Sequence, residues 1–174
     1  MNPSFPSELL HFCPYCGADA FRASDDNCLQ CGVCAKKFFI NAAAAVACVI
    51  VNPQKEILLT RRRFEPAKGM LDLPGGFVNS DETAEDAARR EVCEELNLHV
   101  DALRYFGSST NRYSYDGMLY YTLDLGFECI VSDFSAIQAA DDVEQFLFLP
   151  YNAIDPTLIG FPSIQKLLEM YTTI

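Results

Sequence analysis

The spacing of apolar and polar residues predicts a mixed α/β domain from residue 41 onward. The strand at 57–63 is expected to return antiparallel to the strand at 42–51 after a turn at 52–56. The expected strand at 71–78 is interrupted by Gly75 and Gly76. The expected strands lie at 42–51, 57–63, 71–78, 98–106, 119–131 and 146–149, and the expected helices at 84–96 and 164–171.

Local signals define two of these elements more closely. Thr83 is expected to cap the helix at 84–96 with Asp86 as its reciprocal partner, and Asn97 to end it in the left-handed conformation. Asp116-Gly117 between two tyrosine-rich segments predicts a tight hairpin. The odd positions from Leu119 to Val131 are apolar, which predicts a half-buried strand.

Five of the eight cysteines fall in a short segment near the N-terminus. Cys13 and Cys16 form one CxxC pair, and Cys31 and Cys34 form a second after fourteen intervening residues. Four thiolates spaced in this way suit tetrahedral Zn²⁺, whose binding would stabilise a segment that lacks a large core. The alternative is reduced free cysteines or a redox pair, and Cys28 competes as a ligand because it forms another CxxC with Cys31. We expect a structural zinc ribbon at residues 1–40 and a second domain at 41–174.

The chain is strongly acidic, with 24 acidic and 13 basic residues and a formal net charge of −11. Such a surface repels phosphate backbones, so we expect no nucleic-acid partner, and a phosphate-bearing substrate would need a bridging metal ion. The longest apolar run has ten residues, too short to cross a bilayer, and the N-terminus does not resemble a signal peptide. A cytoplasmic protein without a membrane partner is therefore expected.

The expected helix at 84–96 carries a cluster of carboxylates. At about 100° per residue, Glu91 and Glu95 lie roughly 40° apart on the helix, and Glu94 lies roughly 60° to the other side of Glu91. Carboxylates this close repel one another, and a hard divalent cation such as Mg²⁺ would cancel that repulsion. Gly75 and Gly76 leave backbone carbonyls free to approach the same ion. A solvated acidic face is the alternative, with Arg90 paired to Glu94.

This stretch resembles the Nudix box. The match consists of a glycine, a glutamate, an arginine and three further glutamates at the family's spacing, with an apolar residue on either side of the last pair: Gly76, Glu82, Arg90, Glu91, Val92, Glu94, Glu95 and Leu98. The departure is Asn97 in place of the second glycine, and Asn tolerates the same left-handed geometry. The resemblance extends over about residues 41–174.

The resemblance implies an α/β/α sandwich around a mixed sheet, preceded here by the small zinc ribbon. It implies Mg²⁺- or Mn²⁺-dependent hydrolysis of a nucleoside diphosphate linked to another moiety. By position, Glu91 and Glu95 would ligate the metal, Glu94 would ligate it or act as base, and Gly75 would lend a carbonyl. Glu82 and Arg90 would hold helix and loop in place.

A zinc ribbon ahead of such a domain is similar to the NADH pyrophosphatase group. That group's Ser-Gln-Pro-Trp run is absent here, and the chain has no Trp, so ADP-ribose-like, NADH-like and nucleotide-sugar substrates stay open. Substrate-binding candidates are three residues before the expected hairpin and two arginines of a basic run: Asn111, Arg112, Tyr113, Arg61 and Arg63. The alternatives are hairpin packing for the tyrosines and a solvated strand edge for the arginines.

A further acidic group is expected just before the last strand, where Asp141, Asp142 and Glu144 lie. The family often takes a general base from this region, so Glu144 is a candidate, with a loop acid or cap as the alternative. We predict an enzyme that acts on a small nucleotide, with a homodimer as a candidate assembly. The rival functions are a catalytically inactive ligand sensor or interaction module, and a nucleic-acid-binding zinc ribbon.

Overall fold

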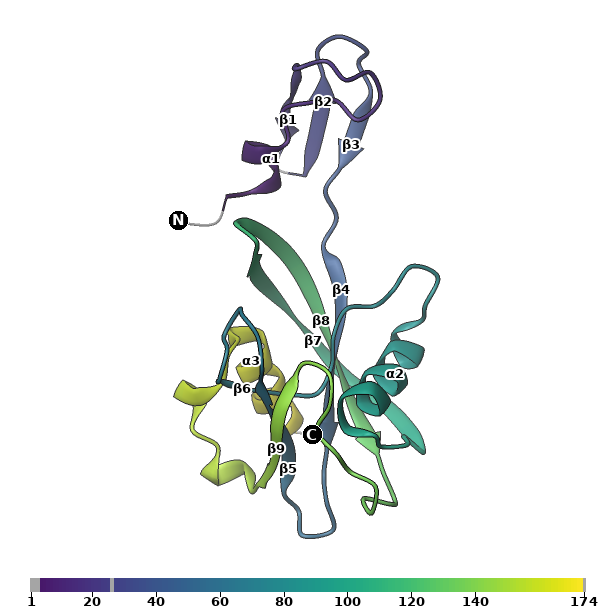
Figure 1. Cartoon of the computed structure of the whole chain (residues 1–174), viewed down its shortest axis with the longest axis vertical. Helices are drawn as coiled ribbons and strands as arrows, with labels where there is room; N and C mark the ends of the chain where they lie inside the picture. Colours follow the sequence, from purple (N-terminus) through teal and green to yellow (C-terminus); the bar gives the residue numbers. More distant parts are fainter. Residues whose placement is uncertain (1–3, 26, 174) are drawn as a thin grey trace. The chain divides into compact units, whose positions relative to one another are not determined.

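A computed structural model describes residues 4–25 and 27–173. The chain divides into two compact units (Figure 1). The first contains the residues up to Ala43 together with Arg112–Tyr121, and the second contains Ala44–Asn111 with the residues from Thr122 onward. No helix in the described part of the chain is long and apolar enough to cross a membrane.

The first unit is built around a small antiparallel sheet. It contains α1 (Pro6–Leu9) and the strands β1 (Phe21–Asp25), β2 (Cys28–Cys31) and β3 (Lys37–Phe39), in the order β1-β2-β3. Its core is a group of fully buried side chains, Cys13, Phe21, Leu29 and Cys31. The hairpin tip also belongs to this unit, because Ser4 exchanges backbone hydrogen bonds with Gly117 and Leu119.

The second unit holds the remaining strands and two longer helices. These elements are β4 (Ala43–Ile50), β5 (Ile57–Arg62), β6 (Leu71–Asp72), α2 (Ala84–Leu96), β7 (Ala102–Tyr115), β8 (Met118–Ile130), β9 (Val143–Leu149), the 3₁₀ turns Tyr151–Ala153 and Pro156–Leu158, and α3 (Pro162–Tyr171). The hairpin ends of β7 and β8 and the first residue of β4 are counted with the first unit. The strands form two three-stranded sheets among the described residues, ordered β4-β8-β7 and β6-β5-β9.

Strand β4 is covered on both faces, which creates the layers of the domain. Its residues Val46, Cys48 and Ile50 pack in one core with Val92 and Leu96 of α2. Its residues Ala47 and Val49 pack in a second core with Ile164, Leu167 and Leu168 of α3. The continuous apolar run of β4 is typical of a strand buried on both faces, and the two cores give the expected α/β/α arrangement.

The Thr83 cap, the helix end at Asn97 and the hairpin turn are confirmed, whereas the Asp86 carboxylate accepts from the Thr83 hydroxyl at 2.7 Å and completes no capping box. Helix α2 spans Ala84–Leu96; the Thr83 side chain accepts a hydrogen bond from the backbone N–H of Asp86, and Asn97 ends the helix at φ 54°. In the hairpin, Asp116 and Gly117 have φ values of 47° and 77°. Positive φ at both central residues is the two-residue turn that matches strand twist.

Several strand predictions need correction. The strand at 57–63 pairs with β9 and β6 in a sheet that does not include β4, and an isolated bridge joins Ile57 to Val51, the residue after β4. Only Leu71–Asp72 of the segment 71–78 is a regular strand, and β7 begins at Ala102 rather than residue 98. The predicted strand at 146–149 begins earlier, at Val143.

The alternation predicted along β8 holds only in its second half. Phe127 and Cys129 are buried as expected, but Thr122 and Asp124 are buried while Leu123 is 38% exposed. Both faces of β8 are covered: odd residues reach the α2 core, and Gly126 lies against Leu167 of α3. A strand covered on both faces cannot be assigned from one-sided alternation.

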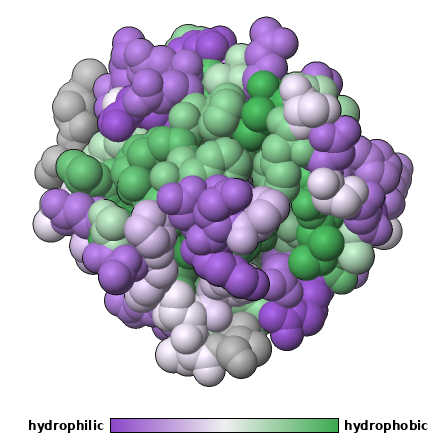
Figure 2. Space-filling model, turned by 90° about the horizontal axis from the view of Figure 1, so that it is seen from below, coloured by the Kyte–Doolittle hydropathy of each residue, from purple (hydrophilic) through white to green (hydrophobic). Residues whose placement is uncertain are grey.

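The surface mixes apolar and polar residues. On the face drawn in Figure 2, green hydrophobic residues form a continuous area bordered by purple hydrophilic ones. Exposed apolar side chains are common on folded proteins, so this area does not by itself mark a functional site. The charged and metal-ligating side chains are more informative.

Candidate active site

Arg90, in the middle of α2, connects the carboxylates predicted to form the site. Its guanidinium contacts Glu82 at 2.8 Å, Glu91 at 2.7 Å and Glu94 at 3.0 Å. It also donates to the backbone carbonyl of Phe77 at 3.0 Å. Arg90 therefore ties the segment before α2 to the glutamate face of the helix.

Glu95 is anchored to the glycine segment instead. It is 7% exposed, and its carboxylate accepts the Gly75 N–H at 3.0 Å. Gly75 has φ 148°, and a side chain there would lie 2.0 Å from the Val46 carbonyl oxygen. Only glycine fits at this position, so the glycine segment can pass close beside the glutamate helix.

Glu91 lies against the second glycine. A Cβ at Gly76 would fall 2.5 Å from Oε1 of Glu91, so the absence of a side chain makes room for this carboxylate. The Gly76 carbonyl accepts the Val46 N–H at 2.8 Å and is committed to that strand contact. A glycine carbonyl ligand for a metal would therefore come from Gly75.

The carboxylates of the site experience different electrostatic environments. Burial raises the pKa of Glu91, and burial raises that of Glu95 well above its usual range, with nearby negative charges adding to both shifts. Hydrogen bonds from Arg90 lower the pKa of Glu82 to about 2. Glu94 keeps a side chain that is 48% exposed. This combination of concentrated negative charge and oxygen donors fits a hard divalent cation.

Two loop acids add negative charge to this region. Burial is the main cause of the raised pKa of Glu91 and of Glu95, and the charges of Asp141 and Asp142, respectively, contribute a smaller upward shift. The Ala140 N–H donates to the Glu95 carbonyl at 2.8 Å, which holds this loop at the end of α2. Glu144 lies two residues into β9 and is exposed. The sequence showed acids here, and the fold adds that the loop carrying Asp141 and Asp142 is bonded to the end of α2.

The basic run at 61–63 is engaged with the protein itself. Arg61 donates to the Gly69 carbonyl, and Arg62 forms a 3.0 Å ion pair with Asp72. Arg63 donates to the carbonyls of Asp141 at 2.6 Å and Val143 at 2.7 Å. Both Arg61 and Arg63 donate hydrogen bonds to backbone carbonyls of loops. Their contact with substrate stays a prediction.

The other substrate-binding candidates lie on β7. Asn111 belongs to the second unit, while Arg112 and Tyr113 belong to the first unit with the hairpin tip. The ring of Tyr113 stacks on Tyr115 with centroids 6.5 Å apart. Both tyrosines lie on β7, so this is a contact within one strand, and the cross-strand packing offered as the alternative stays a prediction.

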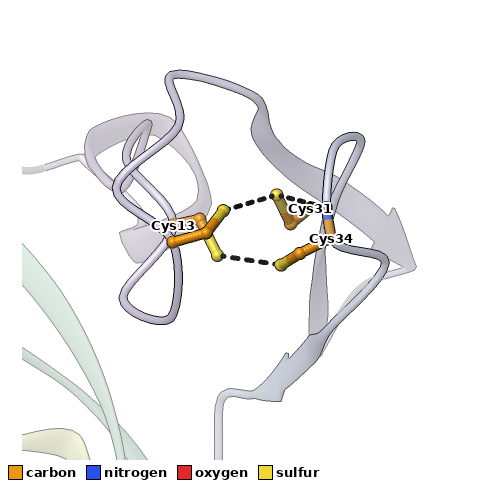
Figure 3. A group of neighbouring side chains, drawn as sticks. Cys13, Cys31 and Cys34 are labelled. Atoms are coloured by element: carbon orange, nitrogen blue, oxygen red, sulfur yellow. Dashed lines mark hydrogen bonds between the residues drawn. The ribbon is translucent and has the colours of Figure 1, made fainter.

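The four cysteines of the paired motifs converge in the first unit (Figure 3). Their sulfur atoms all lie within 4.8 Å of one another, and Cys13–Cys34 and Cys16–Cys31 are each 3.7 Å apart. A tetrahedral zinc ion with Zn–S bonds of about 2.3 Å separates its sulfur ligands by about 3.8 Å. The thiol group of Cys28 instead points to the Leu29 carbonyl. The cluster therefore fits zinc.

The second CxxC also provides hydrogen bonds for a thiolate. The backbone N–H groups of Val33 and Cys34 donate to the sulfur of Cys31, each at 3.4 Å. The pKa of the Cys31 thiol is lowered to about 6, and these two backbone hydrogen bonds, first that from Cys34 and then that from Val33, are the main causes. A thiol with this pKa is readily available as the thiolate that a metal requires.

Comparisons with known proteins identify relatives of this chain. The NAD-capped RNA hydrolase NudC of Vibrio parahaemolyticus is 36% identical over 103 residues, covering 59% of this chain and 38% of that protein. NudC of Vibrio cholerae is 29% identical over 135 residues, covering 78% of this chain and 49% of that protein. The chain thus spans no more than about half the length of these relatives.

Solved structures share the fold. A NUDIX hydrolase from Nitrosomonas europaea superposes with a TM-score of 0.70 at 22% identity, covering 94% of this chain and 91% of that chain. The NUDIX domain of Shewanella oneidensis NrtR complexed with ADP ribose superposes with a TM-score of 0.60 at 19% identity, covering 78% and 89%. The NUDIX domain family model matches residues 41–167. Since this match covers most of the chain, and Arg90 of the box contacts Glu82, Glu91 and Glu94 in the structure, the chain belongs to the NUDIX domain family of hydrolases.

Proposed function

We propose that this chain hydrolyses the diphosphate linkage of a nucleoside diphosphate joined to another moiety, using Mg²⁺ or Mn²⁺. The observation that carries the proposal is the assembly of Glu91, Glu94 and Glu95 on one face of α2 beside the Gly75–Gly76 segment. When bound, the cation would neutralise the diphosphate and activate a water molecule.

The residues of the chain divide the remaining work. Glu91 and Glu95, with the Gly75 carbonyl, are the ligands we propose for the cation. Glu94 is the most accessible glutamate of the three, so it can complete the ligand set or take a proton from the attacking water. Arg90 and Glu82 do not need to touch substrate, because their ion pair holds the helix against the segment before it.

We also propose that Cys13, Cys16, Cys31 and Cys34 hold a structural Zn²⁺. The sulfur separations of 3.7 Å and the two N–H bonds to Cys31 support this. Four protein ligands leave no open position, so the zinc would stabilise the small first unit rather than take part in hydrolysis.

For the substrate, we propose an adenosine diphosphate derivative of the ADP-ribose or NAD(H) type, with a nucleotide sugar as the alternative. Support comes from the names of similar proteins, which include an NAD-capped RNA hydrolase and a domain complexed with ADP ribose. We take the substrate to be a small molecule, because the net charge of −11 opposes binding of a long phosphate backbone.

A substrate panel tests this function. Purified protein with Mg²⁺ would be incubated with ADP-ribose, NADH, nucleotide sugars, dinucleoside polyphosphates, nucleoside triphosphates and a short NAD-capped RNA, and the products identified by mass. Cleavage between the two phosphates of one substrate class is the expected result. Ligand binding without turnover of any substrate would instead favour the catalytically inactive sensor.

A further inference from the structure

Arg63 connects two parts of the second unit that are far apart in sequence. Nη1 of Arg63 donates to the Asp141 carbonyl at 2.6 Å, and Nη2 donates to the Val143 carbonyl at 2.7 Å. The Arg63 backbone N–H donates to the Asp142 carbonyl at 2.9 Å. Three successive carbonyls of one loop are thus bound by a single residue at the end of β5.

The same loop is fastened to the glutamate helix from its other side. Ala140 donates its N–H to the Glu95 carbonyl at 2.8 Å, and Gln138 donates to the Leu96 carbonyl at 3.0 Å. Asp141 has φ 48°, a left-handed conformation that aspartate tolerates better than most non-glycine residues. The loop is therefore fastened by backbone hydrogen bonds to α2 on one side and by Arg63 on the other.

That conformation holds the backbone of two aspartates close to the end of α2. Asp141 directly follows Ala140, whose N–H bonds to the Glu95 backbone carbonyl, and Arg63 binds the Asp141 carbonyl rather than its carboxylate. A planar guanidinium that binds two carbonyls restricts the peptide groups more tightly than a lysine ammonium could. With its backbone held in this way, the loop keeps both aspartate side chains available to the glutamate face.

We propose that Arg63 is a positioning residue of the hydrolytic site, which clamps the Ala140–Val143 loop so that Asp141 and Asp142 stay beside Glu91 and Glu95. The inference rests on the proposed function, because it assigns these aspartates to that same site. It also gives Arg63 a different task from substrate contact. An arginine whose donors are bound to loop carbonyls acts on the reaction through the loop.

A double-mutant cycle tests this proposal. Arg63→Ala should lower kcat by roughly ten- to a hundredfold, since small misplacements of groups at an active site have costs of that size. Asp141→Asn with Asp142→Asn should lower kcat by a similar factor. If Arg63 acts through these aspartates, adding Arg63→Ala to that pair should lower kcat by no more than about twofold further, whereas independent effects would multiply. Arg63→Lys should recover part of the loss.

Hydrogen exchange gives a second readout that does not depend on turnover. The amides of Ala140, Val143 and Arg63 are hydrogen-bonded in the clamped loop, so Arg63→Ala should speed their exchange while α2 amides stay protected. Arg89→Ala is the matched control, because Arg89 also donates to a loop carbonyl, that of Val100. It should leave exchange at 140–143 unchanged.

The outcomes separate this inference from the proposed function. Wild-type protein that hydrolyses no substrate overturns the proposed function, while exchange at residues 140–143 still tests the clamp. Active wild-type protein overturns the inference alone if Arg63→Ala keeps normal kcat or normal exchange at 140–143. Full multiplication of the Arg63 effect in the Asp141, Asp142 double variant overturns it as well.

Discussion

Glu82 and Arg90 form a two-point ion pair: Nε of Arg90 lies 2.8 Å from Oε1 of Glu82, and Nη2 lies 2.9 Å from Oε2. The pair joins the segment before α2 to the middle of the helix. Paired, planar contacts of this kind are stronger and more directional than single ones. Because Arg90 also contacts Glu91 and Glu94, the geometry of the glutamate face depends on this pair.

Acid unfolding should report the Glu82–Arg90 pair. The pKa of Glu82 is lowered from 4.5 to about 2 by the hydrogen bonds from Arg90. A lowered native pKa contributes stability that is fully present above the unfolded-state pKa and is lost as the pH falls through the native value. Wild-type protein should therefore lose this contribution progressively between about pH 4.5 and pH 2, and Glu82→Gln should lack it. The measurement is urea unfolding across this range in chelator.

Comparing wild type with Glu82→Gln separates the pH dependence due to Glu82 from that due to the buried glutamates. Glu91 and Glu95 have raised pKa values and act in the opposite direction, but they are present in both proteins. Glu85→Gln, at an exposed position in the first turn of α2, is the matched control and should keep the wild-type pH dependence. Equal pH dependence for wild type and Glu82→Gln would contradict the prediction.

Glu94→Gln should keep the fold and remove most turnover. The change is nearly isosteric, and the Glu94 side chain is half exposed, so packing is little affected. Loss of a catalytic carboxylate has an expected cost of roughly 10²-fold or more in kcat, about 2.7 kcal/mol. Steady-state kinetics at saturating Mg²⁺ measure this, with Glu85→Gln again as control. Turnover like that of the wild type would show that the box residues do not perform the proposed chemistry.

Protein purified without chelator should contain one zinc ion per chain. Cys13→Ser should lower the zinc content and destabilise the first unit, while the α2 carboxylates keep their places in the second unit. Cys28→Ser is the control, because its thiol lies outside the four-sulfur cluster. Elemental analysis checks both results. Absence of zinc from the wild type, or its loss in Cys28→Ser alone, would overturn the ligand assignment.

Substrate choice should depend on Arg112 and Tyr113 more than on the box. The box handles the diphosphate and the metal, which every candidate substrate shares, so discrimination has to come from groups that touch the rest of the molecule. Arg112→Ala or Tyr113→Ala should change the ratio of kcat/KM between two substrates, whereas Glu91→Gln should lower both values together. Unchanged ratios across the panel would mean that the stacked rings of Tyr113 and Tyr115 have a structural role only.

The sequence by itself determined the parts of this protein that depend on near neighbours along the chain. Helix α2, its cap at Thr83 and its end at Asn97 follow from periodicity and from hydrogen bonds that span three or four residues. The spacing of the glutamates on that helix is fixed by helical geometry alone, so the family could be identified from them. The two CxxC pairs likewise predicted the four-cysteine cluster, because the two sulfur atoms of each pair are brought together by one short turn.

The tertiary structure decided what depends on residues far apart in sequence. Strand β5 was predicted in place, but its pairing with β9 rather than β4 depends on how the chain returns to the sheet. That pairing brings Arg63 to the loop at 140–143 and the loop to the end of α2. The position of the loop at the end of α2 is therefore set by hydrogen bonds between elements some forty to eighty residues apart. Hydrophobic periodicity reports only on residues close together in sequence and cannot predict such contacts.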